Sequence, residues 1–415
     1  MKPSLSMKSD TNIKIPLAFI IYALVALVAA QIILFFNNDL LLGAQFRTPD
    51  IWMGTHFLLL GFAVMIAMGA MYQLVPVAFL TPIWSQKLGL VQFLLTAAGV
   101  TLFAVLIGFQ PAKAIYGGVI AVMGIILFIF QMAITIMKQQ NKGMMTYFVL
   151  SAITSFFLTI IAGFLLAWNI AFGAIETHLP ILFSHMVLGV AGWFTLLIFG
   201  FSYKLVPMFS LSHGFSMKRA KIAFLAYVIG LIFLIASFWF RFVYLETLGW
   251  VLLFLGFGFF ALDMKEILTK RLKRKLDKPF IFSLLAIANG LIIHFLALMI
   301  HLFGIETSAL WGWLTFLYVM CWIVFSIMGY LYKIVPFLWW THKYSSKIGK
   351  EKVPTLKDLI DEKLSVVLFI SLIISVIGLV MGGLLQIGLV VVLFQGLLAL
   401  TSLVYAASII RVLFI

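Results

Sequence analysis

Long apolar runs separated by short polar segments cover most of the chain. Continuous apolar runs long enough to cross a hydrocarbon core of ~30 Å are typical of membrane-spanning helices. Twelve such runs lie near residues 14–36, 51–76, 88–109, 114–137, 146–170, 180–207, 219–241, 244–268, 279–302, 308–336, 363–384 and 387–412. The pattern therefore predicts an all-α integral membrane protein with twelve transmembrane helices.

An eight-residue pattern, Gly-x-x-Tyr-x-[Leu/Ile]-Val-Pro, closes three of these runs. The copies begin at Gly69, Gly200 and Gly329, and their prolines lie 131 and 129 residues apart. Each copy ends the second helix in a group of four. A fixed period usually marks one structural unit that packs against its sisters. We therefore predict a single membrane domain, 1–412, built as three four-helix repeats in a pseudo-threefold arrangement, at about 14–137, 146–268 and 279–412.

The tyrosine and proline of this pattern have a simple interpretation. A tyrosine at a membrane interface buries its ring and wets its hydroxyl, so Tyr72, Tyr203 and Tyr332 are expected to be interface anchors. Proline lacks a backbone N–H, so the proline four residues later is expected to end each helix.

The composition supports a membrane protein. Hydrophobic residues make up 64% of the chain and charged residues 10%, with a mean hydropathy of +1.20, far from the balance of a soluble domain. A single cysteine, Cys321, excludes an internal disulfide framework. The N-terminal segment is polar and basic with no small-residue cleavage site after it, so we expect it to be retained.

The net charge of +15 lies almost entirely on one side of the predicted helices. Segments on that side hold Lys2, Lys8, Lys14, Lys87, Lys138, Lys142, Lys218, Arg219, Lys221, Lys270 to Lys275 and Lys343 to Lys357. The opposite loops hold only Arg47, Lys113 and Arg241, together with Glu176, Glu246 and Glu306. The positive-inside rule then predicts a multi-pass protein of the cell membrane with both termini and the 338–361 loop in the cytoplasm.

This placement of charge also bears on partners. Since the basic residues face one membrane surface, they indicate contact with membrane lipid and not with nucleic acid. The basic run at 270–278 is expected to determine topology and to touch anionic headgroups.

Histidines are the polar residues that best indicate chemistry, because no Asp, Glu, Lys or Arg lies at the middle of a predicted helix. His56 and His185 each lie about five residues into the second and sixth helices, 13 and 15 residues before the repeated glycine. Intramembrane histidines are costly and usually find a partner, an ion or a cofactor. His56 and His185 are therefore candidate ligands of a cofactor or metal, with an interhelical hydrogen bond as the alternative.

Two further candidate metal ligands, His294 and His301, lie in the outer half of the ninth helix. Their separation of seven residues places them ~10 Å apart along one helix face. They cannot both bind the same metal, and hydrogen bonding between helices is again the alternative. His178 lies just outside the sixth helix, whereas His213 and His342 fall in inner loops and are expected to be surface residues.

Twelve helices in three groups of four, with a histidine near the outer end of helices two and six, resemble subunit I of the heme–copper oxidase superfamily and the related NnrS family. The resemblance implies cofactors held nearer the outer face. By position, His56 matches the helix-two histidine that ligates a low-spin heme, and His185 matches the helix-six histidine that ligates copper. Arg47 and Arg241, both on the outer side, would neutralise heme propionates.

Several residues of that superfamily are missing here. The tenth helix, 308–336, has no histidine, and the seventh, 220–241, lacks the histidine pair that binds copper. Met186-Val187-Leu188 follows His185 where oxidases carry Pro-Glu-Val-Tyr. The sequence therefore does not predict a complete oxygen-reducing centre.

The function expected from this resemblance is heme binding in a redox, nitric-oxide-response or heme-handling role. Copper is a second candidate cofactor, and a respiratory-chain or heme-delivery protein is the expected partner. If the protein is an enzyme, it is expected to be a heme-dependent oxidoreductase. The alternatives are a twelve-helix secondary transporter and a cofactor-free scaffold or assembly factor. Transporters commonly consist of two six-helix halves with a polar midplane, whereas the period here is four helices.

Overall fold

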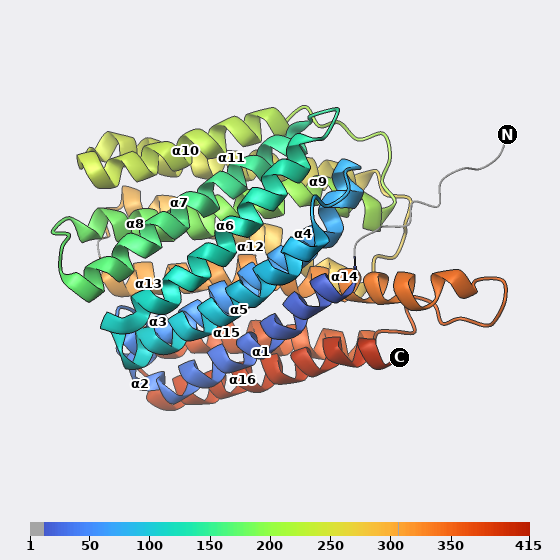
Figure 1. The fold of residues 1–415 in the computed structure, drawn as a ribbon. Coiled ribbons are helices and arrows are strands. Elements are labelled where there is room, and N and C mark those ends of the chain that lie inside the picture. The colour runs from blue at the N-terminus through green and yellow to red at the C-terminus, as the bar shows by residue number, and fades with distance from the viewer. Residues whose placement is uncertain (1–11, 306) are drawn as a thin grey trace.

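The computed structural model describes residues 12–305 and 307–415, and all regular secondary structure within them is helical. Twelve helical spans are long and apolar enough to cross a membrane, which confirms the predicted number. The predictions that used Lys2, Lys8 and Glu306 concern positions outside the described residues. The spans run along one axis, and α1 begins at the end of the bundle where α16 finishes (Figure 1).

Nine spans consist of α-helix, two of them with a short 3₁₀ turn. They are α1 (Lys14–Phe36), α5 (Gln86–Phe109), α6 (Ala114–Met137) after η2 (Pro111–Lys113), α7 (Met144–Phe172), α10 (Ala220–Phe240), α11 (Val243–Thr269), α12 (Lys278–Leu302), α15 (Glu362–Leu384), and α16 (Gly388–Arg411) before η6 (Val412–Phe414). Two short elements, α2 (Asn38–Leu42) and η5 (Ser345–Lys347), lie between spans.

The second, sixth and tenth spans each contain a π-helical segment between two α-helices. Span 2 is α3 (Pro49–His56), η1 (Phe57–Val64) and α4 (Met65–Phe79); span 6 is α8 (His178–Val187), η3 (Leu188–Thr195) and α9 (Leu196–Ser210); span 10 is α13 (Ser308–Leu317), η4 (Tyr318–Val324) and α14 (Phe325–Lys343). The π segments begin 12, 12 and 11 residues before the repeated glycines. Such segments are rare and often accompany functional sites.

Spans 2, 6 and 10 are also the most buried spans. In an apolar stretch of 18 residues from each, 78%, 56% and 78% of the residues are buried, whereas the next value is 50%, for α1. We call them the inner spans. The η3 segment of span 6 contacts η4 of span 10, and the hydroxyls of Thr195 and Tyr318 lie 2.6 Å apart across that contact. Ser202 and Tyr330 make a second hydrogen bond between the same two spans, at 3.1 Å.

The outer spans meet in sequence around the inner ones. α6 contacts α7, α11 contacts α12, and α16 returns to contact α1. At the last of these contacts Gln395 Nε2 donates to Gln31 Oε1 at 3.0 Å, and both glutamines are fully buried. The first and last spans are therefore joined by a polar contact as well as by apolar packing.

The repeated glycines let each inner span approach the helix that begins its own group of four. A Cβ on Gly69 would lie 2.7 Å from Phe19 Cβ on α1, and one on Gly200 would lie 3.0 Å from Val149 Cγ2 on α7. A Cβ on Gly329 would overlap the Ser283 hydroxyl on α12. Small residues allow membrane helices to pack at such close range.

The repeated tyrosines are not the interface anchors that the sequence predicted. Tyr72, Tyr203 and Tyr332 are only 0%, 5% and 2% exposed. Each hydroxyl meets a polar side chain on the fourth helix of its own group, at 2.7 Å from Gln131 Nε2, 2.9 Å from Asp263 Oδ2 and 2.9 Å from Ser408 Oγ, respectively. The expectation of a wet hydroxyl is wrong because a helix from the same group supplies the partner.

The predicted helix stop at each repeated proline is also wrong. Pro76, Pro207 and Pro336 lie inside α4, α9 and α14, which continue to Phe79, Ser210 and Lys343. Membrane helices tolerate proline where neighbouring groups satisfy the freed carbonyl. The first two helices end instead at a left-handed residue, Leu80 and Leu211. Residues 338–343 of the predicted 338–361 loop are therefore helical.

Candidate functional site

His56 is the last residue of α3 and stands directly before the π segment η1. Its Nδ1 lies 2.7 Å from the carbonyl oxygen of Trp52, one helical turn earlier. Because a carbonyl can only accept, Nδ1 carries the proton and Nε2 presents a lone pair. The imidazole packs edge-on to the Phe103 ring at 5.0 Å. Among the described residues, nothing hydrogen-bonds to Nε2.

His185 has the same arrangement of ring nitrogens. Its Nδ1 lies 2.9 Å from the carbonyl oxygen of Thr159 on the neighbouring α7. The ring rests on Gly163, where a Cβ would lie 2.8 Å from the imidazole Cε1. Nε2 of His185 likewise has no hydrogen-bond partner in the described part of the chain. In both histidines the backbone thus fixes the tautomer and leaves the same nitrogen free.

His56 and His185 occupy similar places in their spans. His56 stands directly before the π segment of span 2, and His185 stands three residues before the π segment of span 6. Both side chains are half-buried.

Arg47 and Arg241, which the sequence predicts to be on the outer side, lie near α8. The Arg47 guanidinium lies 5.5 Å from the centre of the Phe183 ring, two residues before His185. Arg241 follows α10, which is held against α8 by a hydrogen bond of 3.1 Å from Trp239 Nε1 to Ser184 Oγ. Both arginines are exposed, and neither forms an ion pair within the described residues.

His294 is in a different situation, because both of its ring nitrogens have partners. Nδ1 lies 2.7 Å from the Gly290 carbonyl oxygen, and Nε2 lies 3.2 Å from the Tyr227 hydroxyl. The chain of contacts continues from Tyr227 to Tyr318 at 3.3 Å and then to Thr195. His294 is thus part of a buried hydrogen-bond network that joins spans 6, 7, 9 and 10.

Aromatic rings fill the space around this network. The Phe257 ring lies 4.5 Å from the His294 ring, and Phe199 stacks on Phe260 at 3.8 Å. Trp322 donates its indole N–H to Thr195 Oγ1 at 3.0 Å. This packing leaves His294 no free nitrogen for a ligand, so the region between these four spans is a packed core.

His301 is also fully engaged. Its Nδ1 pairs with Glu246 at 3.4 Å, and its Nε2 lies 2.8 Å from the Thr247 hydroxyl. The predicted metal-ligand roles of His294 and His301 therefore gain no support from their geometry. Within residues 12–305 and 307–415, no three of His, Cys, Asp or Glu gather in a metal-binding group. His178, His213 and His342 are exposed.

Two buried polar clusters were not predicted from the sequence. One is the Tyr227–Tyr318–Thr195 network, and the other is Asp263, which is fully buried and bonds Tyr203 and Arg219. A signal for the second existed in the sequence, because Gln131 and Asp263 follow their tyrosines by 59 and 60 residues. The first cluster has no such signal, since four different spans contribute to it.

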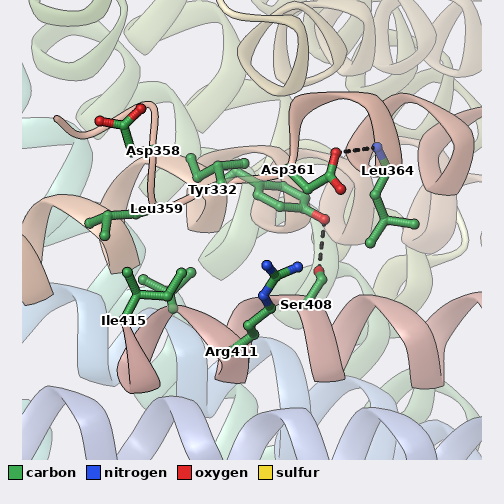
Figure 2. A pocket seen from close by; sticks show the side chains of 10 residues that line it. Tyr332, Asp358, Leu359, Asp361, Leu364, Ser408, Arg411 and Ile415 are labelled. Atoms are coloured by element: carbon green, nitrogen blue, oxygen red, sulfur yellow. Dashed lines mark hydrogen bonds between the residues drawn. The ribbon is translucent and has the colours of Figure 1, made fainter. Parts of the chain in front are cut away.

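A cavity of about 120 Å³ lies at the end of the bundle where α1 begins and α16 finishes, and neither His56 nor His185 lines it. Figure 2 shows the Tyr332–Ser408 hydrogen bond beside it, with Arg411 and Asp361 nearby. Asp361 accepts from the Leu364 backbone N–H at 2.9 Å and so caps α15. The cavity is thus framed by groups that hold spans 10, 11 and 12 together.

No model of a known protein family matches this chain, and no curated protein matches its sequence.

Proposed function

We propose that this protein is a heme-binding integral membrane protein of the heme–copper oxidase type, in which His56, and His185 as a second candidate, would hold the heme. The observation that carries the proposal is the matched state of the two histidines. Each donates Nδ1–H to a backbone carbonyl, and each Nε2 has no hydrogen-bond partner among the described residues.

The side chains present fit a heme in their donor chemistry. Histidines that bind metals usually donate their other ring N–H to a carbonyl or carboxylate, which fixes the ring and raises its basicity. Imidazole is a common axial ligand of heme iron. Arg47 and Arg241 supply positive charge at the outer end of span 6, where propionates would need it. When bound, the heme would supply one-electron redox chemistry or gas binding.

The protein's own residues would position this group. Trp52 and Thr159 hold the two imidazoles through their carbonyls, and Gly163 leaves room for the His185 ring. The Phe103 ring limits the orientation of His56. An apolar shell of this kind lowers the local dielectric and so tunes the potential of a bound metal centre.

The proposal includes three four-helix repeats around a pseudo-threefold axis. Three correspondences support it: each inner span has a π segment, a glycine against the first helix of its group, and a tyrosine bonded to the fourth. We also propose that both termini are cytoplasmic and that the protein lies in the cell membrane, on the strength of the lysine and arginine distribution.

The proposed role is electron transfer, nitric-oxide response or heme handling, with a respiratory-chain or heme-delivery protein as partner. A binuclear heme–copper centre is not part of the proposal. His294 and His301 are committed to other hydrogen bonds, and span 10 carries no histidine in the bilayer.

The direct test is a pyridine-hemochrome spectrum with metal analysis on protein purified in mild detergent after expression with ample heme. We expect a Soret band and iron in stoichiometric amount. Colourless, iron-free protein would contradict the proposal and favour the scaffold interpretation. Saturable solute uptake by vesicles containing the colourless protein would favour the transporter instead.

A further inference from the structure

The α10–α11 pair is the most peripheral part of the bundle. In an apolar stretch of 18 residues, α11 has 28% of its residues buried, the lowest share among the twelve spans, and α10 has 33%. Large apolar side chains on this pair are exposed, including Ile222 at 49% and Leu262 at 49%. In a membrane these side chains would face lipid tails.

A groove lies at the end of this pair where most of the protein's lysines and arginines gather. It is lined by Arg219, Leu262, Lys265, Glu266, Thr269 and Lys270. Four residues of α11 and Lys270, which directly follows it, are spaced i, i+3, i+4, i+7 and i+8, so they share one helix face. That face continues to exposed Leu255, one heptad before Leu262. The charged groove and the exposed apolar side chains therefore adjoin along one face of α11.

Part of the charge in the groove is already balanced. Glu266 pairs with Arg219 at 2.9 Å and with Lys270 at 3.0 Å, and Asp263 lies 3.4 Å from Arg219. The hydrogen bonds that Arg219 donates to Glu266 and then to Asp263 raise the pKa of its guanidinium, so it stays charged. These contacts use only one terminal nitrogen, Nη1. Its other N–H groups remain available to an anion.

The remaining charge is positive. Lys265 is exposed, lines the groove and makes no ion pair within the described residues. Exposed Lys218 and Lys221 flank Arg219 at the start of α10. The groove thus offers a free ammonium group and guanidinium donors directly beside a lipid-facing apolar strip.

We propose that this groove binds the phosphate headgroup of one anionic phospholipid, with its acyl chains along Leu262, Leu255 and Ile222. The apolar strip favours a lipid over free phosphate, because free phosphate has no acyl chain that could pack against the strip. The unpaired lysine favours an anionic headgroup over a zwitterionic one, since each lysine near a membrane surface contributes ~1 kcal/mol to binding anionic lipid. This inference is independent of heme binding.

The test measures retention of phosphatidylglycerol and phosphatidylcholine by the full chain, by native mass spectrometry after purification from nanodiscs that contain both lipids. We expect preferential retention of phosphatidylglycerol and a loss of about fivefold in its affinity in Lys265→Gln, from the contribution of one lysine. The matched control is Lys138→Gln, at the same end of the bundle but outside the groove, exposed and without an ion pair in the described residues. It should leave retention unchanged.

Competition separates the two sources of phosphate. Glycerol phosphate, which has the headgroup chemistry without acyl chains, should not displace phosphatidylglycerol from the wild-type protein. Displacement at millimolar concentration would overturn the lipid assignment. Equal retention of the two lipids, or equal losses in Lys265→Gln and Lys138→Gln, would show diffuse surface charge and would also overturn it.

Discussion

The four histidines considered as ligands differ in whether their second ring nitrogen has a hydrogen-bond partner. His294 and His301 have hydrogen-bond partners at both nitrogens, whereas His56 and His185 have a partner only at Nδ1. A metal ligand must offer a free lone pair, so only the second pair is ready to bind one. At the residue scale, hydrogen bonding sorts chemically identical side chains into structural and ligand candidates.

The first prediction follows from this sorting. His56→Ala should abolish the heme absorption of the purified protein, because it removes the first proposed ligand. His185→Ala should keep heme but shift its absorption, because it removes the second proposed ligand. Absorption spectra of protein made with ample heme measure both. The surface variant His213→Ala should match the wild type, and a wild-type spectrum in His56→Ala would refute the ligand assignment.

The repeated tyrosines give a second prediction at this scale. Tyr203 bonds a buried carboxylate, whereas Tyr332 bonds a neutral hydroxyl. Hydrogen bonds between membrane helices average ~0.6 kcal/mol and reach ~1.7 kcal/mol. We expect Tyr203→Phe to lie near the upper value and Tyr332→Phe near the average. Reversible unfolding in mixed micelles measures the two losses of stability. A larger loss in Tyr332→Phe would contradict the stronger hydrogen bond that we expect between Tyr203 and the Asp263 carboxylate.

At the scale of elements, the inner spans combine a tight contact with a widened turn. The repeated glycines of spans 2, 6 and 10 lie against the first helices of their groups, and a π segment precedes each glycine in the same span. In span 2 the π segment begins directly after His56. The tight contact and the candidate ligand thus lie on the same span, at opposite sides of its π segment.

A third prediction tests the tight contact. Gly69→Ala should destabilise the protein by about 1–3 kcal/mol, the usual cost of overpacking, since its Cβ would lie 2.7 Å from Phe19 Cβ. Gly258→Ala is the matched control, because the nearest atom to its Cβ would be 3.9 Å away. It should show no loss, as alanine favours helix over glycine. Equal thermal unfolding of the two variants would contradict the packing argument.

For the whole molecule, charge and topology are coupled. The segments at 138–143, 211–219, 270–277 and 344–361 lie between successive spans of an even-numbered bundle, so they share one membrane surface with the start of α1 and the end of α16. This surface holds most of the lysines and arginines. The positive-inside rule therefore predicts that it faces the cytoplasm.

The fourth prediction concerns this orientation. Reporter fusions after Lys142 and after Lys275 should be active in the cytoplasm, and fusions at Glu176 and Glu246 should be active outside. Paired alkaline phosphatase and fluorescent protein fusions distinguish the two sides. The reverse pattern would move His56 and His185 to the cytoplasmic half of the bilayer and would undo the proposed pairing of Arg47 with an outer propionate.

The sequence by itself determined that the chain suits a membrane, and it determined the number of spans. These properties depend on run length, which can be read along one chain. The repeated pattern also singled out the glycine and tyrosine that contact the first and fourth helices of each group, although the sequence assigned the tyrosine hydroxyls to water.

Only the tertiary structure decided what those side chains contact. Tyr72, Tyr203 and Tyr332 bond helices about 60 to 76 residues further along the chain, and His294 bonds Tyr227 on another span. Helix periodicity fixes which face a residue occupies but not which helix packs against that face. A buried polar group must find a partner in the bilayer, and the packing of the twelve spans determines which partner it finds. That packing leaves Nε2 free in His56 and His185 and occupied in His294.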